Sequence, residues 1–143
     1  MHSGMNFQEL VRFKTQLEDI QKQIDIYVEQ CAKELAARLL AKVIKRTPVG
    51  KVHGGTLRRG WTGGSNATAY ANSLSVRKNG GEYTIDIINP VEYAEYVEYG
   101  HRTRNHKKWV PGIFMLTLSE KEIQSSAPKI LENKIKKIFE GMR

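Results

Sequence analysis

Three carboxylates lie three residues apart in a short segment whose flanking residues are typical of helix ends: Glu92, Glu95 and Glu98. On a helix this spacing brings side chains onto one face, and closely spaced carboxylates are the groups that hydrolases use for general acid–base catalysis. Like charges at this spacing also cost a helix about a few tenths of a kcal/mol per pair. We therefore interpret the three glutamates as a solvated or intersubunit acidic face, not as a catalytic group.

The histidines and glycines complete no recognisable catalytic or metal site. His53, His101 and His106 lack the i, i+4 spacing of helical metal ligands, and the single cysteine, Cys31, excludes a thiolate zinc cluster by count. The glycine pairs lack the arrangement that aims backbone amides at phosphates, and there is no GxSxG nucleophile elbow. The sequence predicts no enzyme, no metal and no cofactor.

The strongest chemical signal is positive charge, because the chain has 23 basic and 15 acidic residues, a net charge of +8. The segment from 101 to 109 holds four fixed cations: Arg102, Arg104, Lys107 and Lys108. A second basic cluster precedes it: Lys51, Arg58 and Arg59. Such segments contact phosphate backbones without reading bases. No helix-turn-helix, RRM or zinc-finger pattern accompanies them, so nonspecific nucleic-acid contact and a solvated or protein-binding loop both stay open.

A long helix is predicted to come first among the elements that position these residues. Residues 7–46 contain neither Gly nor Pro, and Thr47-Pro48 ends the pattern. Apolar residues alternate three and four apart, as in a heptad repeat: Leu10, Phe13, Leu17, Ile20, Ile24, Tyr27 and Cys31. The spacing then shifts to fours (Leu35, Leu39, Val43), which indicates packing on a globular core. The earlier stripe is either simply core or a self-associating or partner-binding helix around residues 7–24.

The middle of the chain predicts a loop followed by a β-hairpin. Residues 47–67 carry six glycines and predict a flexible basic loop, with a short strand near residues 57–61. Two further strands are expected at 70–76 and 83–88, joined by a tight turn at Asn79-Gly80. Alternation of apolar and mixed positions in the second strand predicts a half-buried sheet that is covered by helix.

The C-terminal part is predicted to be mainly helical. Asn89-Pro90 and Gly100 bracket a short helix, and a polar basic loop follows to residue 110. Residues 111–118 form a helix or an arm, Ser119 and Glu122 offer a capping box, and Pro128 begins a last helix that packs on the sheet. Its inward side chains are expected at four positions: Leu131, Ile135, Ile138 and Met142.

Length and pattern together predict the overall organisation. At 143 residues the chain predicts one domain, residues 1–143, with a helical part (7–46), a basic loop (47–67) and a sheet with helices (68–143). This is the α+β class. No apolar run approaches the roughly 20 residues that a membrane span needs, and the first residues are not typical of a secretory signal, so we expect no membrane contact.

Two segments resemble a known family. They are RTPVG at 46–50 leading to GTLRRGW at 55–61, and NPVEYAEYVEYGH at 89–101. Their order resembles the small tail-completion or minor tail proteins of long-tailed phages and prophages. The chain departs from the pattern at Gly50, where an aspartate is expected, and residues 51–54 look like an insertion.

The resemblance implies a structural protein at the head-proximal end of a phage tail. It implies a ring, usually of six copies, that caps the tail tube and joins it to the neck or connector around the DNA channel. The protein would then lie in the virion after assembly in the host cytoplasm. The alternatives are a nonspecific nucleic-acid-binding domain and the collar of a headless contractile tail-like particle.

The resemblance also directs attention to particular residues. The candidates for contact with another subunit or with the tube are Glu92, Tyr93, Glu95, Tyr96, Glu98, Arg102 and Arg104. The candidates for docking or for contact with DNA in the channel are Lys51, Arg58, Arg59, Lys107 and Lys108. We expect the acidic helix of one copy to meet the basic loop of the next, because a ring repeats one head-to-tail interface.

Overall fold

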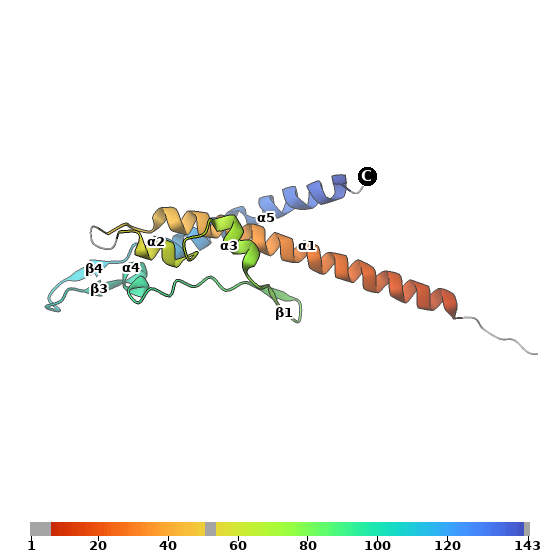
Figure 1. Ribbon diagram of the computed structural model, residues 1–143, viewed down its shortest axis with the longest axis horizontal. Coiled ribbons are helices and arrows are strands. Elements are labelled where there is room, and N and C mark those ends of the chain that lie inside the picture. The colour runs from red at the N-terminus through yellow and green to blue at the C-terminus, as the bar shows by residue number, and fades with distance from the viewer. Residues whose placement is uncertain (1–6, 51–53, 142–143) are drawn as a thin grey trace, which may run out of the picture.

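The computed structural model describes residues 7–50 and 54–141. In chain order the elements are α1 (Gln8–Arg46), α2 (Thr56–Gly60), α3 (Ala67–Ser73), β1 (Arg77–Asn79), β2 (Glu82–Thr84), α4 (Ala94–Tyr99), β3 (Gly100–Arg102), β4 (Trp109–Pro111) and α5 (Met115–Gly141). The molecule is elongated along α1, whose N-terminal half projects alone (Figure 1). The other elements gather around its C-terminal half, so the predicted α+β class is confirmed.

The long N-terminal helix is confirmed, and it ends where the sequence predicts. Thr47 leaves the helix with an extended ψ of 123°, which is the conformation that the following Pro48 imposes on its neighbour. The buried face near this end consists of Ala36, Leu40 and Val43. The expected positions Leu35 and Leu39 are half-buried beside this face.

The strand predicted near residues 57–61 is wrong, whereas the described residues on either side of it, 47–50, 54–55 and 61–66, form turns and irregular chain as the predicted loop requires. Residues 56–60 form helix α2, not a strand, and Leu57 and Trp61 are 4% and 3% exposed. Two large apolar residues four apart lie on one helix face, which explains the helix. Lys51 and His53 lie outside the described residues.

The first predicted strand, residues 70–76, is also wrong, because residues 67–73 form helix α3. Asn66 caps it: its Oδ1 accepts a hydrogen bond from the Ala69 amide at 2.8 Å. The predicted hairpin does follow, between β1 and β2, with Asn79 paired with Glu82. Its turn lies at Gly80-Gly81, and Gly80 supplies the positive φ of 63°.

The expected single sheet under a helix is replaced by two separate hairpins. The second one pairs β3 with β4 and is built from residues that the sequence assigned to a loop. Helix α5 is continuous from Met115, so Pro128 lies inside it and does not begin it. Ser119 is buried within this helix and donates to the Met115 carbonyl at 2.6 Å, so it is not a cap.

Helix α5 packs on α1 instead of on a sheet. Lys42 Nζ lies 2.8 Å from a Glu122 carboxylate oxygen, Arg46 pairs with the other oxygen, and Arg46 Nη1 donates to Ser119 Oγ at 3.0 Å. These two cations hold the pKa of Glu122 down at about 2. Of the predicted inward residues, Leu131 is half-buried and Ile135 is 46% exposed, whereas the side chains of Ile138 and Met142 lie outside the described residues.

The core lies where α1, α2, α3, α4 and α5 meet. Its buried residues are Ala36, Leu40, Val43, Leu57, Trp61, Ala71, Ala94 and Met115. At its centre the Thr47 hydroxyl donates to the Val43 carbonyl at 2.6 Å and accepts from Trp61 Nε1 at 2.8 Å. Thr47 and Trp61 of the first recognisable segment are thus structural, because the Thr47 hydroxyl accepts from the buried indole N–H and itself donates to the Val43 carbonyl.

Candidate functional site

The two segments that carry the family resemblance dock against each other. Asn89 Nδ2 donates to the Leu57 carbonyl at 2.8 Å, while its Oδ1 accepts from the Val91 amide at 3.1 Å. A Cβ on Gly60 would collide with the Asn89 side chain and stand 2.8 Å from Val91 Cγ2. Asn89 therefore does not mark the start of the short helix, and that prediction is wrong. It anchors the segment before α4, which begins five residues later at Ala94.

A close crossing of backbones fixes α4 against the β3–β4 hairpin. Gly100 ends the helix with φ of 91°, and a Cβ there would lie 2.6 Å from the Val110 carbonyl oxygen. A Cβ on Gly112 would collide with the Glu98 carbonyl. The returning chain donates from Ile113 N to the Val97 carbonyl at 2.8 Å, and from Phe114 N to the Glu98 carbonyl at 3.0 Å. The predicted helix end at Gly100 is confirmed.

Glu98 does not share an exposed face with Glu92 and Glu95. It is 5% exposed, and its carboxylate accepts from Leu116 N at 2.8 Å, Thr117 N at 2.9 Å and Thr117 Oγ1 at 3.0 Å. It caps the first turn of α5, where a negative charge complements the helix dipole. Glu92 and Glu95 are exposed. The expectation of one acidic face with three members is therefore wrong for Glu98.

Aromatic side chains gather at this end of the molecule and stay exposed. We define the aromatic cluster as Tyr93, Tyr96, Tyr99, Trp109 and Phe114, which are between 40% and 61% exposed. Tyr96 lies against His101 with ring centroids 5.8 Å apart, and Tyr99 meets Phe114 edge-on at 6.4 Å. The sequence analysis named only Tyr93 and Tyr96. The signal that it missed is the continuation of the same three-residue spacing to Tyr99.

Beside the aromatic cluster, the hairpin turn carries the predicted cations. We define the basic tip as Arg102, Arg104, Lys107 and Lys108, all of which are exposed. Its backbone is held by Thr103 and Asn105: the Thr103 amide donates to the Lys108 carbonyl at 2.8 Å, and Asn105 Oδ1 accepts from the Lys107 amide at 3.1 Å. In the described part of the chain none of the four cations has an ion-pair partner. The tip presents unneutralised charge on an ordered turn.

Arg58 and Arg59 of the second basic cluster lie on helix α2. Arg58 Nε donates to the Thr47 carbonyl at 2.7 Å, so this arginine ties α2 to the end of α1. Arg59 is exposed and reaches the Gly54 carbonyl at 3.4 Å. Lys51 lies outside the described residues. The structure therefore places Tyr93, Tyr96 and the basic tip along the segment from Tyr93 to Lys108, whereas Arg58 is occupied at the junction of α2 and α1.

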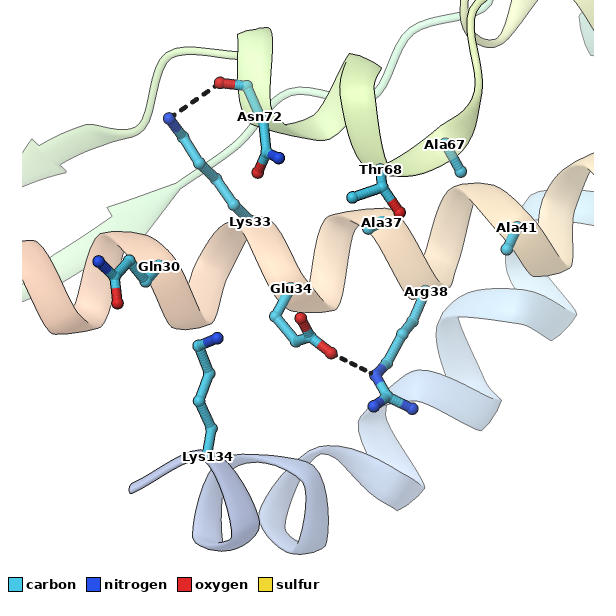
Figure 2. Close-up of a pocket in the computed structure, with 10 residues that line it drawn as sticks. All are labelled: Gln30, Lys33, Glu34, Ala37, Arg38, Ala41, Ala67, Thr68, Asn72 and Lys134. Atoms are coloured by element: carbon cyan, nitrogen blue, oxygen red, sulfur yellow. Dashed lines mark hydrogen bonds and ion pairs between the residues drawn. The ribbon is translucent and has the colours of Figure 1, made fainter. Parts of the chain in front are cut away.

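A groove of about 470 Å³ lies on the other side of the core, between α1, α3 and α5 (Figure 2). Figure 2 shows Lys33 reaching the Asn72 carbonyl and Glu34 paired with Arg38, at 3.1 and 3.0 Å. Lys134 approaches from α5. These two interactions occupy part of the groove's polar groups, and within residues 7–50 and 54–141 no three potential metal ligands come together. We assign no chemistry to it.

A comparison with protein families shows to which family this chain belongs. A family model described as "Bacteriophage HK97-gp10, putative tail-component" matches residues 12–100, more than half of the chain. The chain belongs to the HK97-gp10-like family. Neither curated proteins nor solved structures give a match.

The match extends from the exposed half of α1 through Gly100, and so contains the first docked segment, the second one except for His101, and all of α4. The HK97-gp10-like family is one of phage tail components, which supports a structural role in the virion and contact with other phage proteins. The basic tip and α5 lie beyond the matched range. Among the described helices, none is long and apolar enough to cross a membrane.

Proposed function

We propose that this HK97-gp10-like protein completes the tail at its head-proximal end. Copies of the chain, six in the arrangement that the resemblance implies, form a ring that caps the tail tube and joins it to the neck or connector. The ring assembles in the host cytoplasm and remains in the virion. The chain forms a single structural domain and has no enzymatic role.

The observation that carries this proposal is the exposed aromatic cluster on a rigidly held support. Its members are not needed for the core, yet the helix and hairpin that present them are fixed by the Gly100–Gly112 crossing and by the Glu98 cap. Exposed aromatic side chains on preorganised backbone are typical of the centres of protein interfaces. A subunit interface uses such a surface, whereas a solvated loop does not.

In this proposal, opposite charges determine which surfaces of neighbouring copies meet. Glu92, Glu95, Tyr93 and Tyr96 of one copy face Arg102 and Arg104 of the next copy, or the tube. Glu98 is excluded because its carboxylate is fully used inside the chain. Lys107 and Lys108, together with Arg59, remain for nonspecific contact with DNA in the channel. Such contact weakens steeply as salt rises.

Electron microscopy of particles made with and without the gene tests the proposal. We expect its loss to give unjoined heads and tails or tubes of uncontrolled length. Normal particles that lack the protein would overturn the proposal, and salt-dependent DNA binding of the purified chain would then support the nucleic-acid-binding alternative. If the particles are headless in the wild type, the same protein is the collar of a tail-like particle.

A charge-reversal pair tests the interface within that assay. We expect Arg104→Glu to reduce the yield of joined particles at least tenfold, and Glu95→Arg in the same chain to restore part of it. Lys121→Glu, an exposed reversal on α5, is the matched control and should leave the yield unchanged. Undiminished assembly in the Arg104→Glu variant would remove this residue from the interface.

A further inference from the structure

The projecting half of α1 carries an apolar stripe that nothing in the described chain covers. We define the arm as residues 8–26; at 1.5 Å per residue it is about 28 Å long. The side chains of its stripe are between 46% and 62% exposed: Leu10, Phe13, Leu17, Ile20 and Ile24. Figure 1 shows most of this part of the helix projecting beyond the other elements, and the β1–β2 hairpin meets its last turn at Asp25. An isolated helix of this length is marginal in water, since most helical stability comes from packing an apolar face.

The stripe is not an outlying part of the molecule's own core. At 100° per residue, the direction of the stripe from Leu10 to Cys31 differs by about 140° from that of the buried face formed by Ala36, Leu40, Val43 and Thr47. Helix α5 lies on the stripe's side of α1, because Lys42, which pairs with Glu122, is 18 residues or five turns from Ile24, but its described residues leave the stripe from Leu10 to Ile24 exposed. The β1–β2 hairpin, which binds Asp25 through Lys78 and Tyr83 at 2.8 and 2.6 Å, lies to the side of it. The stripe needs an occupant of its own.

The heptad pattern indicates what that occupant is. We propose that the arm packs against the arms of at least two further copies of this chain, in a parallel, in-register coiled-coil bundle. This goes beyond the proposed function, because it requires copies of the chain but no tail tube, neck or DNA. In heptad notation the stripe places Leu10, Leu17 and Ile24 at position a, and Phe13 and Ile20 at position d.

Side-chain types at these positions set the number of strands. Two-stranded coils favour β-branched residues at a with Leu at d, whereas Leu at a with Ile at d favours three or more strands. The heptad of Leu17 and Ile20 has the second pattern, and Phe13 adds a bulky ring at d. We therefore infer a bundle larger than a dimer.

The residues at the flanking heptad positions, e and g, determine whether the helices run parallel or antiparallel. Position g holds Glu9 and position e of the next heptad holds Lys14, which is the pair that parallel, in-register helices bring together. Antiparallel helices would pair g with g and e with e, and so would not join these two charges. The remaining flanks are uncharged glutamines (Gln16, Gln21, Gln23), so no like-charge repulsion opposes the parallel arrangement. Lys14 is exposed, 3.9 Å from Glu18 of its own helix, and is available to a neighbour.

The first test measures the mass of the purified full-length chain by light scattering. We expect a trimer or a larger oligomer, and a monomer for the Leu17→Glu/Ile20→Glu variant. Thr15→Glu/Lys22→Glu, two substitutions on the outer face of the same helix, is the matched control and should keep the oligomer. Tryptophan fluorescence, which reports on buried Trp61, should show that both variants keep the core.

The second test uses cross-linking to determine whether the arms run parallel and in register. In a Cys31→Ser background, Leu10→Cys should link to its own counterpart in a neighbouring copy under oxidising conditions, and Thr15→Cys should link at least tenfold less. A wild-type chain that is monomeric at about 100 µM would overturn the proposal and assign the stripe to another protein. An oligomer that survives the Leu17→Glu/Ile20→Glu change, or equal cross-linking at both cysteines, would overturn it as well.

Discussion

Both halves of α1 have apolar residues at helical spacing, but their surroundings differ. Around Leu40, which is fully buried, the chain supplies its own partners from α2, α3, α4 and α5. Around Leu17, which is 50% exposed, it supplies none among the described residues. Periodicity thus determines that a segment is a helix and which face is apolar, but not which molecule covers that face. The compact end owes its stability to contacts within the chain, and the arm does not.

The largest expected effect comes from the same substitution made in each half. Leu40→Ala should lower the free energy of unfolding by about 2–5 kcal/mol, since it leaves a cavity in the core. Leu17→Ala, measured at a dilution where copies are separate, should change it by less than about 0.5 kcal/mol. Denaturant titration followed by tryptophan fluorescence measures both. Equal losses of unfolding free energy in the two variants would mean that the arm is part of the folded core, and would contradict the difference between the two halves of α1.

A smaller effect is expected at the backbone crossing under α4. Gly100→Ala forces a side chain into a left-handed conformation and against the Val110 carbonyl, and should cost about 1–3 kcal/mol or more. Gly81→Ala, whose Cβ would meet nothing within 4 Å, is the control and should be nearly neutral. Thermal unfolding checks the pair. An unchanged melting temperature for Gly100→Ala would show that the crossing does not stabilise the compact end.

Removal of the buried cap is expected to have an effect near 1 kcal/mol. Glu98→Ala leaves two amides of the first turn of α5 without an acceptor and removes the charge that complements its dipole, so the free energy of unfolding should fall by about 1–2 kcal/mol. Glu95→Ala, exposed on the same helix, should change it by less than about 0.5 kcal/mol. Similar losses in the two variants would contradict the assignment of Glu98 to the interior.

The smallest effect is a pH dependence at the junction of α1 and α5. Lys42 and Arg46 hold the pKa of Glu122 at about 2, below its usual 4.5. The ion pairs therefore stabilise the fold above the unfolded pKa, and this contribution is lost as pH falls from about 5 toward 2. Glu122→Gln should have a melting temperature that depends less on pH over this range than the wild type, whereas exposed Glu120→Gln should follow the wild type. Parallel pH profiles for Glu122→Gln and wild type would refute the ion-pair account.

Sequence reasoning predicted the elements whose signals are local. The length and end of α1, the turn near Gly80 and the end of α4 at Gly100 all follow from the absence of breakers or from a required positive φ. It failed where a tertiary contact decides. The glycines of residues 47–67 predicted a loop followed by a short strand, but residues 56–60 form a helix that buries Leu57 and brings Trp61 to Thr47.

The candidate site was predicted in part for the same reason. The cations of the basic tip could be located from the sequence, because the local composition alone reveals them. Glu98 could not be told from Glu95 by charge, because only the path of the chain after Gly112 brings the first turn of α5 to its carboxylate. Arg58 was likewise indistinguishable from Arg59 until the end of α1 placed an acceptor beside it.

The position of Met115 in the core has a consequence during synthesis on the ribosome. The arm is complete once residue 26 has been made, but the core around Leu40 closes only when Met115 arrives, roughly 90 residues later. At translation rates of about 5–20 residues per second this is an interval of about 5–20 s. Throughout it the nascent chain exposes the arm while its own fold is unfinished. Chains made close together on one messenger therefore have time to meet through their arms before any of them has finished folding.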